Sequence, residues 1–92
     1  MNKGKIQKII KKNFKSFNSR YIFSLIADQD FCTRNELIKW TGFSKITIDK
    51  YLQRFSKARL INNAPGIVYV SDLGEQIYSS FYDFFKMHNK IS

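Results

Sequence analysis

The stretch "TRNELIKWTGFSKITIDKYLQRFSKARLI", residues 33–61, contains the start and stop signals of two helices joined by a short turn. Thr33 and Glu36 have the spacing of a capping box, in which the side chain of each residue accepts a hydrogen bond from the backbone N–H of the other. Gly42 suits the left-handed conformation that ends a helix, and Ser44 suits the N-cap of the next helix. Two helices joined by a turn of about four residues predict a helix-turn-helix over residues 33–59.

The second of these helices, predicted over about residues 44–58, has two different faces. Ile48, Leu52 and Phe55 recur at helical spacing and predict the face that packs on a core. Ile46 is apolar but lies outside that stripe. The opposite face is polar and cationic, with Lys45, Thr47, Lys50, Arg54 and Lys57.

Positive charge is concentrated in two blocks of the chain. Sixteen Lys and Arg oppose seven Asp and Glu, which gives a net charge of +9 over 92 residues. Residues 1–20 carry seven basic side chains and no acidic one, and residues 33–59 carry seven basic and two acidic ones. Such clusters favour a polyanionic partner, because bound phosphates release counterions. Charge alone leaves nucleic acid, an anionic membrane surface and a merely solvated surface open.

Several classes of protein are disfavoured by the composition. The longest apolar runs fall far short of the roughly 20 residues of a membrane span, and no secretory signal is visible, so we expect an intracellular, cytoplasmic (nucleoid-associated) protein. One histidine and one cysteine are too few for a metal site. No nucleophile–base pair or glycine-rich phosphate loop is present, so we expect neither an enzyme nor a cofactor. Cys32 is predicted to be a small buried hydrophobe, with an intersubunit disulfide left open.

The N-terminal segment, residues 1–17, predicts a basic amphipathic helix. Its apolar residues keep helical spacing and its other positions are filled by lysines. Ser19 is the predicted cap of a following helix, whose apolar stripe includes Tyr21, Ile22, Leu25 and Ile26.

The C-terminal third predicts a hairpin and a helix. Pro65 and Gly66 suit the central positions of a turn, because proline fixes φ and glycine supplies a positive φ. Strand-forming residues follow, so a short hairpin is predicted over residues 60–70. Ser71 is the predicted cap of one long helix over residues 71–88. With no linker or repeat, residues 1–92 read as a single domain.

This order of elements resembles the winged helix-turn-helix family of DNA-binding regulators, in particular the small MarR- and PadR-type repressors. The resemblance covers about residues 19–86. It rests on the stretch 33–61, the hairpin, and "VSDLGEQI" at residues 70–77, which is similar to the family's "LTxxG" segment after the wing. It implies a mainly α fold with a small β-hairpin, extended here by N- and C-terminal helices.

Two departures from the family pattern concern the wing. Arg59 stands where the family usually has a glycine, so this arginine is predicted to adopt a positive φ. No Lys or Arg lies between Leu60 and Phe85, whereas the family often has a basic wing tip. Any contact of the wing with DNA would come from Asn62, Asn63 or backbone N–H groups.

The resemblance implies that the helix at residues 44–58 enters the major groove, whose width admits a helix. Lys45 and Lys50 would reach phosphates or guanine acceptors, and Ile46 a thymine methyl. Arg54 and Lys57 would contact phosphate. Asp49 would accept from a cytosine amine or pair with an adjacent cation, and we favour the ion pair. The candidate DNA-binding residues are Ser44, Lys45, Ile46, Thr47, Lys50, Arg54, Lys57, Arg34, Asn62 and Asn63.

Aromatic residues of the C-terminal segment form a stripe that looks too wide for one chain to cover. Wide apolar surface of this kind marks an interface, so a homodimer is predicted, built from the two terminal helices. The alternative is that the N-terminal helix covers the stripe within one chain. The candidate interface residues are Ile6, Ile10, Phe14, Ile77, Tyr78, Phe81, Phe84 and Phe85.

The sequence therefore predicts a homodimer that binds double-stranded DNA sequence-specifically and regulates transcription. The N-terminal lysines would add non-specific phosphate attraction. Membrane binding ranks low, because the apolar face of that helix has no tryptophan and is needed for the dimer. No small-molecule ligand is evident. The alternatives are a non-specific DNA-coating or architectural protein, and a winged-helix module that binds other proteins.

Overall fold

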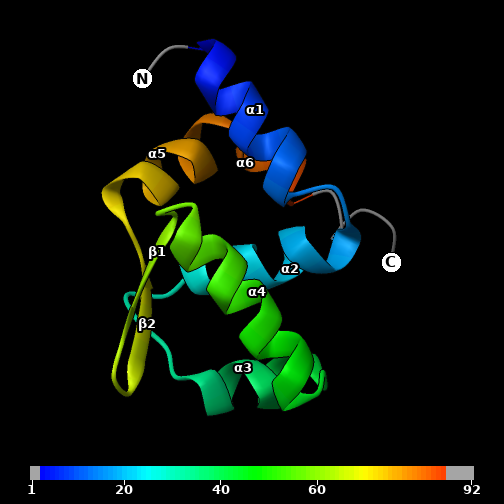
Figure 1. Cartoon of the computed structure of the whole chain (residues 1–92), viewed down its shortest axis with the longest axis vertical. Coiled ribbons are helices and arrows are strands. Elements are labelled where there is room, and N and C mark those ends of the chain that lie inside the picture. The colour runs from blue at the N-terminus through cyan, green and yellow to red at the C-terminus, as the bar shows by residue number, and fades with distance from the viewer. Residues whose placement is uncertain (1–2, 87–92) are drawn as a thin grey trace.

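A helix-turn-helix and a β-hairpin lie at one end of the molecule, and the terminal helices cover the other end (Figure 1). The structure, a computed structural model, describes residues 3–86. Its elements confirm the predicted mainly α fold with a small hairpin, a winged helix-turn-helix. In chain order they are α1 (Lys3–Asn13), α2 (Phe17–Ala27), α3 (Arg34–Thr41), α4 (Lys45–Lys57), β1 (Ile61–Ala64), β2 (Ile67–Val70), α5 (Asp72–Ser80) and α6 (Tyr82–Phe85).

The predicted caps of the helix-turn-helix are all present. The Thr33 hydroxyl accepts from the Glu36 N–H at 3.0 Å, and the Thr33 N–H donates to the Glu36 carboxylate at 2.9 Å. Gly42 ends α3 with φ 74°, in the left-handed region. The Ser44 hydroxyl accepts from the Thr47 N–H at 3.1 Å and so caps α4. These local bonds fix where each helix begins and ends, and therefore how α4 is presented.

The wing is a β-hairpin whose strands are joined by a two-residue loop, Pro65 and Gly66. Strands β1 and β2 pair antiparallel from Ile61 opposite Val70 to Ala64 opposite Ile67, and Gly66 has the predicted positive φ, 86°. Cys32 pairs with Val68 on the other side of β2, through N–H···O bonds of 2.8 and 2.7 Å. The segment before α3 is thereby tied to the wing.

The junction between α4 and the wing depends on a strained residue. Arg59 has φ 63°, as predicted from the absence of the family's glycine. The Ser71 hydroxyl donates to the Arg59 carbonyl at 2.7 Å and also caps α5. The Ser71 N–H donates to the Leu60 carbonyl at 3.0 Å. These bonds hold the start of α5 against the end of α4 and offset the strain at Arg59.

Four phenylalanine rings form the centre of the core. Phe14 precedes α2, Phe23 lies on α2, Phe55 on α4 and Phe85 on α6, and all four are at most 1% exposed. The Phe14 ring centroid lies 4.9 Å from that of Phe23, 5.4 Å from that of Phe55 and 4.8 Å from that of Phe85. The core thus joins the terminal segments to the buried face of α4.

Two predicted helix boundaries are wrong. α1 ends at Asn13 rather than at residue 17, because the chain must turn there to bring Phe14 into the core, and the Asn13 side chain bonds back to the Ile9 carbonyl at 2.9 Å. Ser16, not Ser19, caps α2 by accepting from the Ser19 N–H at 3.1 Å, while Ser19 itself is buried.

The prediction of one long helix over residues 71–88 is also wrong. The helix breaks at Phe81, which has φ −125° and ψ 37°, and residues 87–88 lie outside the described residues. The break redirects the chain so that Phe85 of α6 packs on Phe14 and Phe23. The helical spacing of apolar residues continues through Phe81, so the sequence pattern does not reveal the break.

A methyl group at residue 74 would clash with the backbone, so we expect Gly74→Ala to destabilise the fold. A Cβ there would lie 2.1 Å from the Leu60 oxygen and 2.6 Å from Val70 Cγ2. Such overpacking lowers the free energy of unfolding by about 1–3 kcal/mol, which is measured as a lower urea midpoint with an unchanged slope. Gln76→Ala, at an exposed position of the same helix, is the control. Equal midpoints for the two variants would contradict this close approach.

Candidate nucleic-acid interface

The N-terminal half of α4 presents polar and cationic side chains to solvent. Ile48 and Leu52 are buried on its inner face, whereas Lys45 and Lys50 are exposed and Ile46 is 82% exposed. An isoleucine with so much of its surface exposed at the tip of a helix has no role in this core. It is available for an apolar contact outside the chain, and its contact with a thymine methyl stays a prediction.

The hydroxyls at the start of α4 are used locally. Ser44 caps the helix and its hydroxyl also bonds the Thr47 hydroxyl, at 3.0 Å. Thr47 is half-buried. Both side chains are therefore held in place, so that this turn is ordered before any partner binds. The main role of Ser44 is to cap α4, although its side chain is exposed and a phosphate could also approach it.

Asp49 forms the ion pair that we favoured over a cytosine contact, but it does so with Arg34 and not with an adjacent cation. Arg34 Nη1 lies 3.3 Å from Asp49 Oδ1, with both side chains nearly half exposed. The partner is on α3 rather than on α4 itself, so only the fold brings the two together. The pair neutralises the one carboxylate on the outer face of α4, and it also engages Arg34, a candidate DNA-binding residue.

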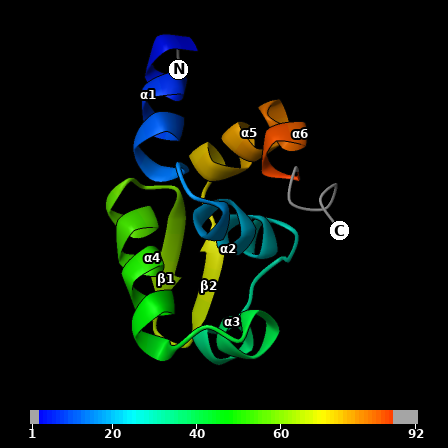
Figure 2. The ribbon, with the colours of Figure 1, turned by 90° about the vertical axis from the view of Figure 1, so that its right-hand side faces the viewer.

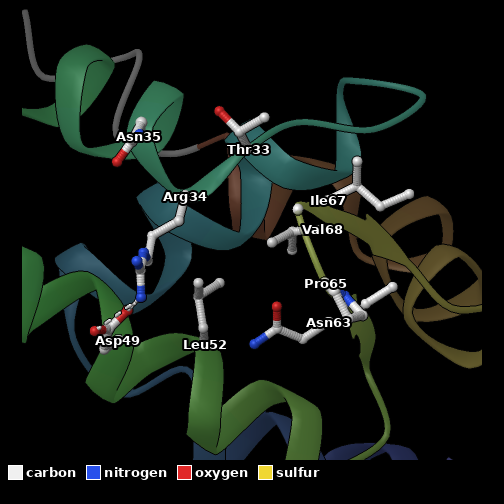
Figure 3. Close-up of a pocket in the computed structure, with 11 residues that line it drawn as sticks. Thr33, Arg34, Asn35, Asp49, Leu52, Asn63, Pro65, Ile67 and Val68 are labelled. Atoms are coloured by element: carbon white, nitrogen blue, oxygen red, sulfur yellow. Dashed lines mark hydrogen bonds and ion pairs between the residues drawn. The ribbon is translucent and has the colours of Figure 1, made fainter.

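An open groove of about 520 Å³ runs between this ion pair and the wing (Figure 3). Figure 3 shows the dashed Arg34–Asp49 contact on one side and Asn63 with Pro65 on the other. The fold therefore brings Arg34 of α3 and Asn63 of β1 to one groove, 29 residues apart in the sequence. Asn62 is exposed but lines neither this groove nor the next one.

A second groove follows the outer face of α4 towards its C-terminus, and its volume is about 680 Å³. Two of its residues, Gln53 and Ser56, were missed by the sequence analysis. Helical spacing from Lys50 could have placed Gln53 on this face. The lining residues are Lys50, Gln53, Arg54, Ser56, Lys57 and Asn63.

The candidate dimer residues divide into two groups. Ile6, Phe14, Ile77, Tyr78 and Phe85 are buried within one chain, because α1, α2 and the bent C-terminal segment cover one another. The expectation that one chain could not cover the C-terminal stripe is wrong for Ile77, Tyr78 and Phe85. Ile10, Phe81 and Phe84 remain half-buried, and Phe84 lies under the Arg20 guanidinium at 5.3 Å. The candidate interface narrows to these three.

The C-terminal segment is held to α2 by a small polar network. The Tyr78 hydroxyl and the Lys86 ammonium both donate to the Asp28 carboxylate. Burial, and then the bond to Asp28, raises the pKa of Tyr78 to about 12. Burial acts to lower the pKa of Lys86, but its bonds to Asp28 and Tyr78 outweigh this and raise it. The network supports the fold and lies away from α4.

Cys32 is fully buried, as predicted for a small hydrophobe. Burial, and then the nearby charge of Glu36, raises the pKa of its thiol to about 11. Nowhere in residues 3–86 do three or more His, Cys, Asp or Glu side chains gather closely enough to hold a metal ion. None of the helices in the same range has the length and apolar character that a membrane-spanning segment requires.

Comparison with known proteins supports the fold. The sequence matches no protein-family model and no curated protein. The structure is similar to the crystal structure of ligand-free NadR, with a TM-score of 0.72 and 15% identity over 96% of this chain and 67% of that chain. It is also similar to NadR in complex with 4-hydroxyphenylacetate, with a TM-score of 0.68 at the same identity and coverage. NadR is a MarR-family winged-helix regulator, and at this identity the similarity shows the fold.

The buried thiol of Cys32 should resist alkylation in the folded protein. Because its pKa is raised from 9.0 to about 11, little thiolate is present near pH 8, and access is blocked as well. We expect iodoacetamide labelling to be slow in native buffer, to become rapid in urea, and to accelerate with pH only towards 11. Mass spectrometry measures the labelled fraction. Rapid native labelling at pH 8 would show that the segment between α2 and α3 opens readily.

Proposed function

We propose that this protein is a cytoplasmic transcriptional regulator that binds double-stranded DNA as a homodimer. The observation that carries the proposal is the division of α4 into a buried face and an exposed face. Ile48 and Phe55 are fully buried, while Lys45, Ile46 and Lys50 project from the first turns. A helix fixed in this way can lie in the major groove with its N-terminal residues at the base edges.

Residues 45–50 would supply sequence preference in this proposal. Ile46 would contact a thymine methyl, and Lys45 and Lys50 would donate to guanine acceptors or phosphates. Arg34 of α3 would contact a phosphate, either by breaking its ion pair with Asp49 or while keeping that pair. Asn63 lines both grooves beside α4, so the wing would contribute a polar contact in place of the basic tip of the family.

Non-specific DNA coating is a second candidate function, and the outer face of α4 favours it. Arg54 and Lys57 line the groove at its C-terminal half, where they would meet phosphates rather than bases. Phosphate contacts raise affinity for all sequences alike. A specific-to-non-specific affinity ratio below about tenfold would support this candidate, since regulators reach about 10³ or more.

The first test is binding to random-sequence duplex DNA from about 50 to 200 mM salt, for the wild type and Lys45→Ala/Lys50→Ala. We expect a wild-type Kd of about 10⁻⁴ to 10⁻⁶ M and a log–log salt slope that is smaller by about two in the variant. Lys3→Ala/Lys11→Ala is the control, because it removes the same charge from α1 at positions that line none of the grooves described here.

Two results would count against the proposal. A wild-type Kd weaker than about 10⁻⁴ M at physiological salt would mean that even ordinary non-specific affinity is missing. The fold would then serve as a protein-interaction module. Equal losses in the Lys45→Ala/Lys50→Ala variant and the control would place DNA elsewhere than on the tip of α4.

The homodimer should depend on the half-buried aromatic surface at the C-terminal segment. We expect the wild type to sediment as a dimer at micromolar concentration and Phe84→Ser to sediment as a monomer with the same helical circular dichroism. Phe31→Ser is the control, because Phe31 is 60% exposed and lies between α2 and α3. A dimer would present two α4 helices about 34 Å apart, matching successive major grooves. A monomeric wild type would contradict this part of the proposal.

A further inference from the structure

The cationic surface of α4 extends beyond the C-terminal half of this helix onto α1. In both ribbon views α1 lies beyond the C-terminal end of α4 (Figures 1 and 2). Two grooves join these helices, with volumes of about 400 and 420 Å³, and Lys12, Asn13 and Arg54 line both. Lys15 lines the first, and Lys8 and Lys57 line the second. We call Lys8, Lys12, Lys15, Arg54 and Lys57 the α1–α4 patch.

Arg54 connects the patch to the DNA-binding face of α4. It lines the two grooves beside α1 and also the groove that contains Lys50 and Asn63. Its guanidinium lies 5.2 Å from the centroid of the Tyr51 ring, and the Tyr51 hydroxyl lies 3.3 Å from the Ser16 hydroxyl. Stacking on a ring that is itself held in place reduces the freedom that Arg54 loses when it binds an anion.

The positive charge of the patch is not neutralised within the described part of the chain. No acidic residue appears among the described residues that line these three grooves. The ion pairs Arg34–Asp49 and Lys86–Asp28 lie elsewhere. All five cations of the patch are exposed. Like charges gathered in one place repel, and an anionic partner would relieve this repulsion.

The dimensions fit a nucleic-acid backbone better than a small anion. Along α4, Lys50 and Lys57 are separated by about 10 Å, at a rise of about 1.5 Å per residue. The patch adds the last turns of α1 to this length. Each strand of double-stranded DNA carries about one charge per 3.4 Å of the helix axis, so that a strand alongside α4 would offer about three phosphates over about 10 Å.

A membrane surface is a poorer partner, because α1 has no free apolar face. Ile6 is buried, and Ile9 and Ile10 pack against the core. An interfacial helix must place its apolar side among the lipids. Here that side holds α1 on the protein, and the exposed residues of α1 are its lysines together with Gly4 and Gln7.

We propose that the α1–α4 patch binds a second stretch of sugar–phosphate backbone, beyond the strand that the N-terminal half of α4 contacts. This inference rests on the proposed DNA binding and adds to it a longer footprint. It also divides the N-terminal lysines: Lys8, Lys12 and Lys15 contact phosphate, whereas Lys3 and Lys11 contribute only general attraction.

The test compares Lys8→Ala/Lys12→Ala with the matched variant Lys3→Ala/Lys11→Ala, which loses the same charge from the same helix. Both are titrated against a random-sequence duplex of about two helical turns over a salt series. We expect the salt slope to fall by about two for the patch variant and by clearly less for the matched variant. Equal slopes for the two variants would overturn the inference, because the lysines would then act as diffuse charge.

The same titrations separate this inference from the proposed function. If Lys45→Ala/Lys50→Ala weakens DNA binding but Lys8→Ala/Lys12→Ala does not, the patch proposal fails and the proposal that α4 enters the major groove is kept. If only Lys8→Ala/Lys12→Ala weakens DNA binding, the proposal that the patch binds phosphate is kept and the major-groove proposal fails.

Two competitors identify the source of the phosphate. Inorganic phosphate should compete only through ionic strength, and vesicles of phosphatidylserine should bind the wild type more weakly than DNA at equal salt. Saturable binding of inorganic phosphate that Lys8→Ala/Lys12→Ala abolishes would reassign the patch to a free anion. Preferential binding to vesicles would reassign it to a membrane. Either result would overturn the inference.

Discussion

The packing of Phe14 against Phe23, Phe55 and Phe85 is the constraint on which the rest of the structure depends. These rings come from the segment before α2, from α2, from α4 and from α6. A large buried aromatic side chain contributes about 1.5–3 kcal/mol through burial alone, and the ring contacts add to it. The cluster therefore fixes α4 from inside, and the position of every candidate DNA-binding side chain on α4 follows from it.

The same packing explains the two irregularities of the chain. α1 stops at Asn13 so that Phe14 can turn inwards, and the C-terminal helix breaks at Phe81 so that Phe85 can do so. Each break ends a helix that periodicity alone would continue. The free energy of burying a phenylalanine exceeds the cost of ending a helix a turn early, so the tertiary contact decides.

The electrostatics of the outer surface follow from this arrangement. The Arg34–Asp49 pair neutralises the carboxylate on the face of α4, and the packing of α1 beyond the C-terminal end of α4 brings Lys12 and Arg54 to one groove. Neither contact is local in sequence. Together they leave an exposed cationic surface that runs from the tip of α4 to α1, and this is the surface on which the proposed DNA contacts depend.

Local chemistry allowed the sequence by itself to determine the helix-turn-helix, its caps and the hairpin. The Thr33–Glu36 box, Gly42, Ser44 and Gly66 act on backbone within a few residues, whereas the positive φ of Arg59 was predicted from the resemblance to a family that usually has a glycine there. Helical spacing also gave the buried face of α4 and the exposure of Ile46. Only the tertiary structure decided the partner of Asp49, the burial of Phe14, Ile77 and Phe85 within one chain, and the meeting of α1 with α4. Those contacts join residues up to 71 positions apart, from Phe14 to Phe85, and depend on how the helices pack, which spacing along one helix does not encode.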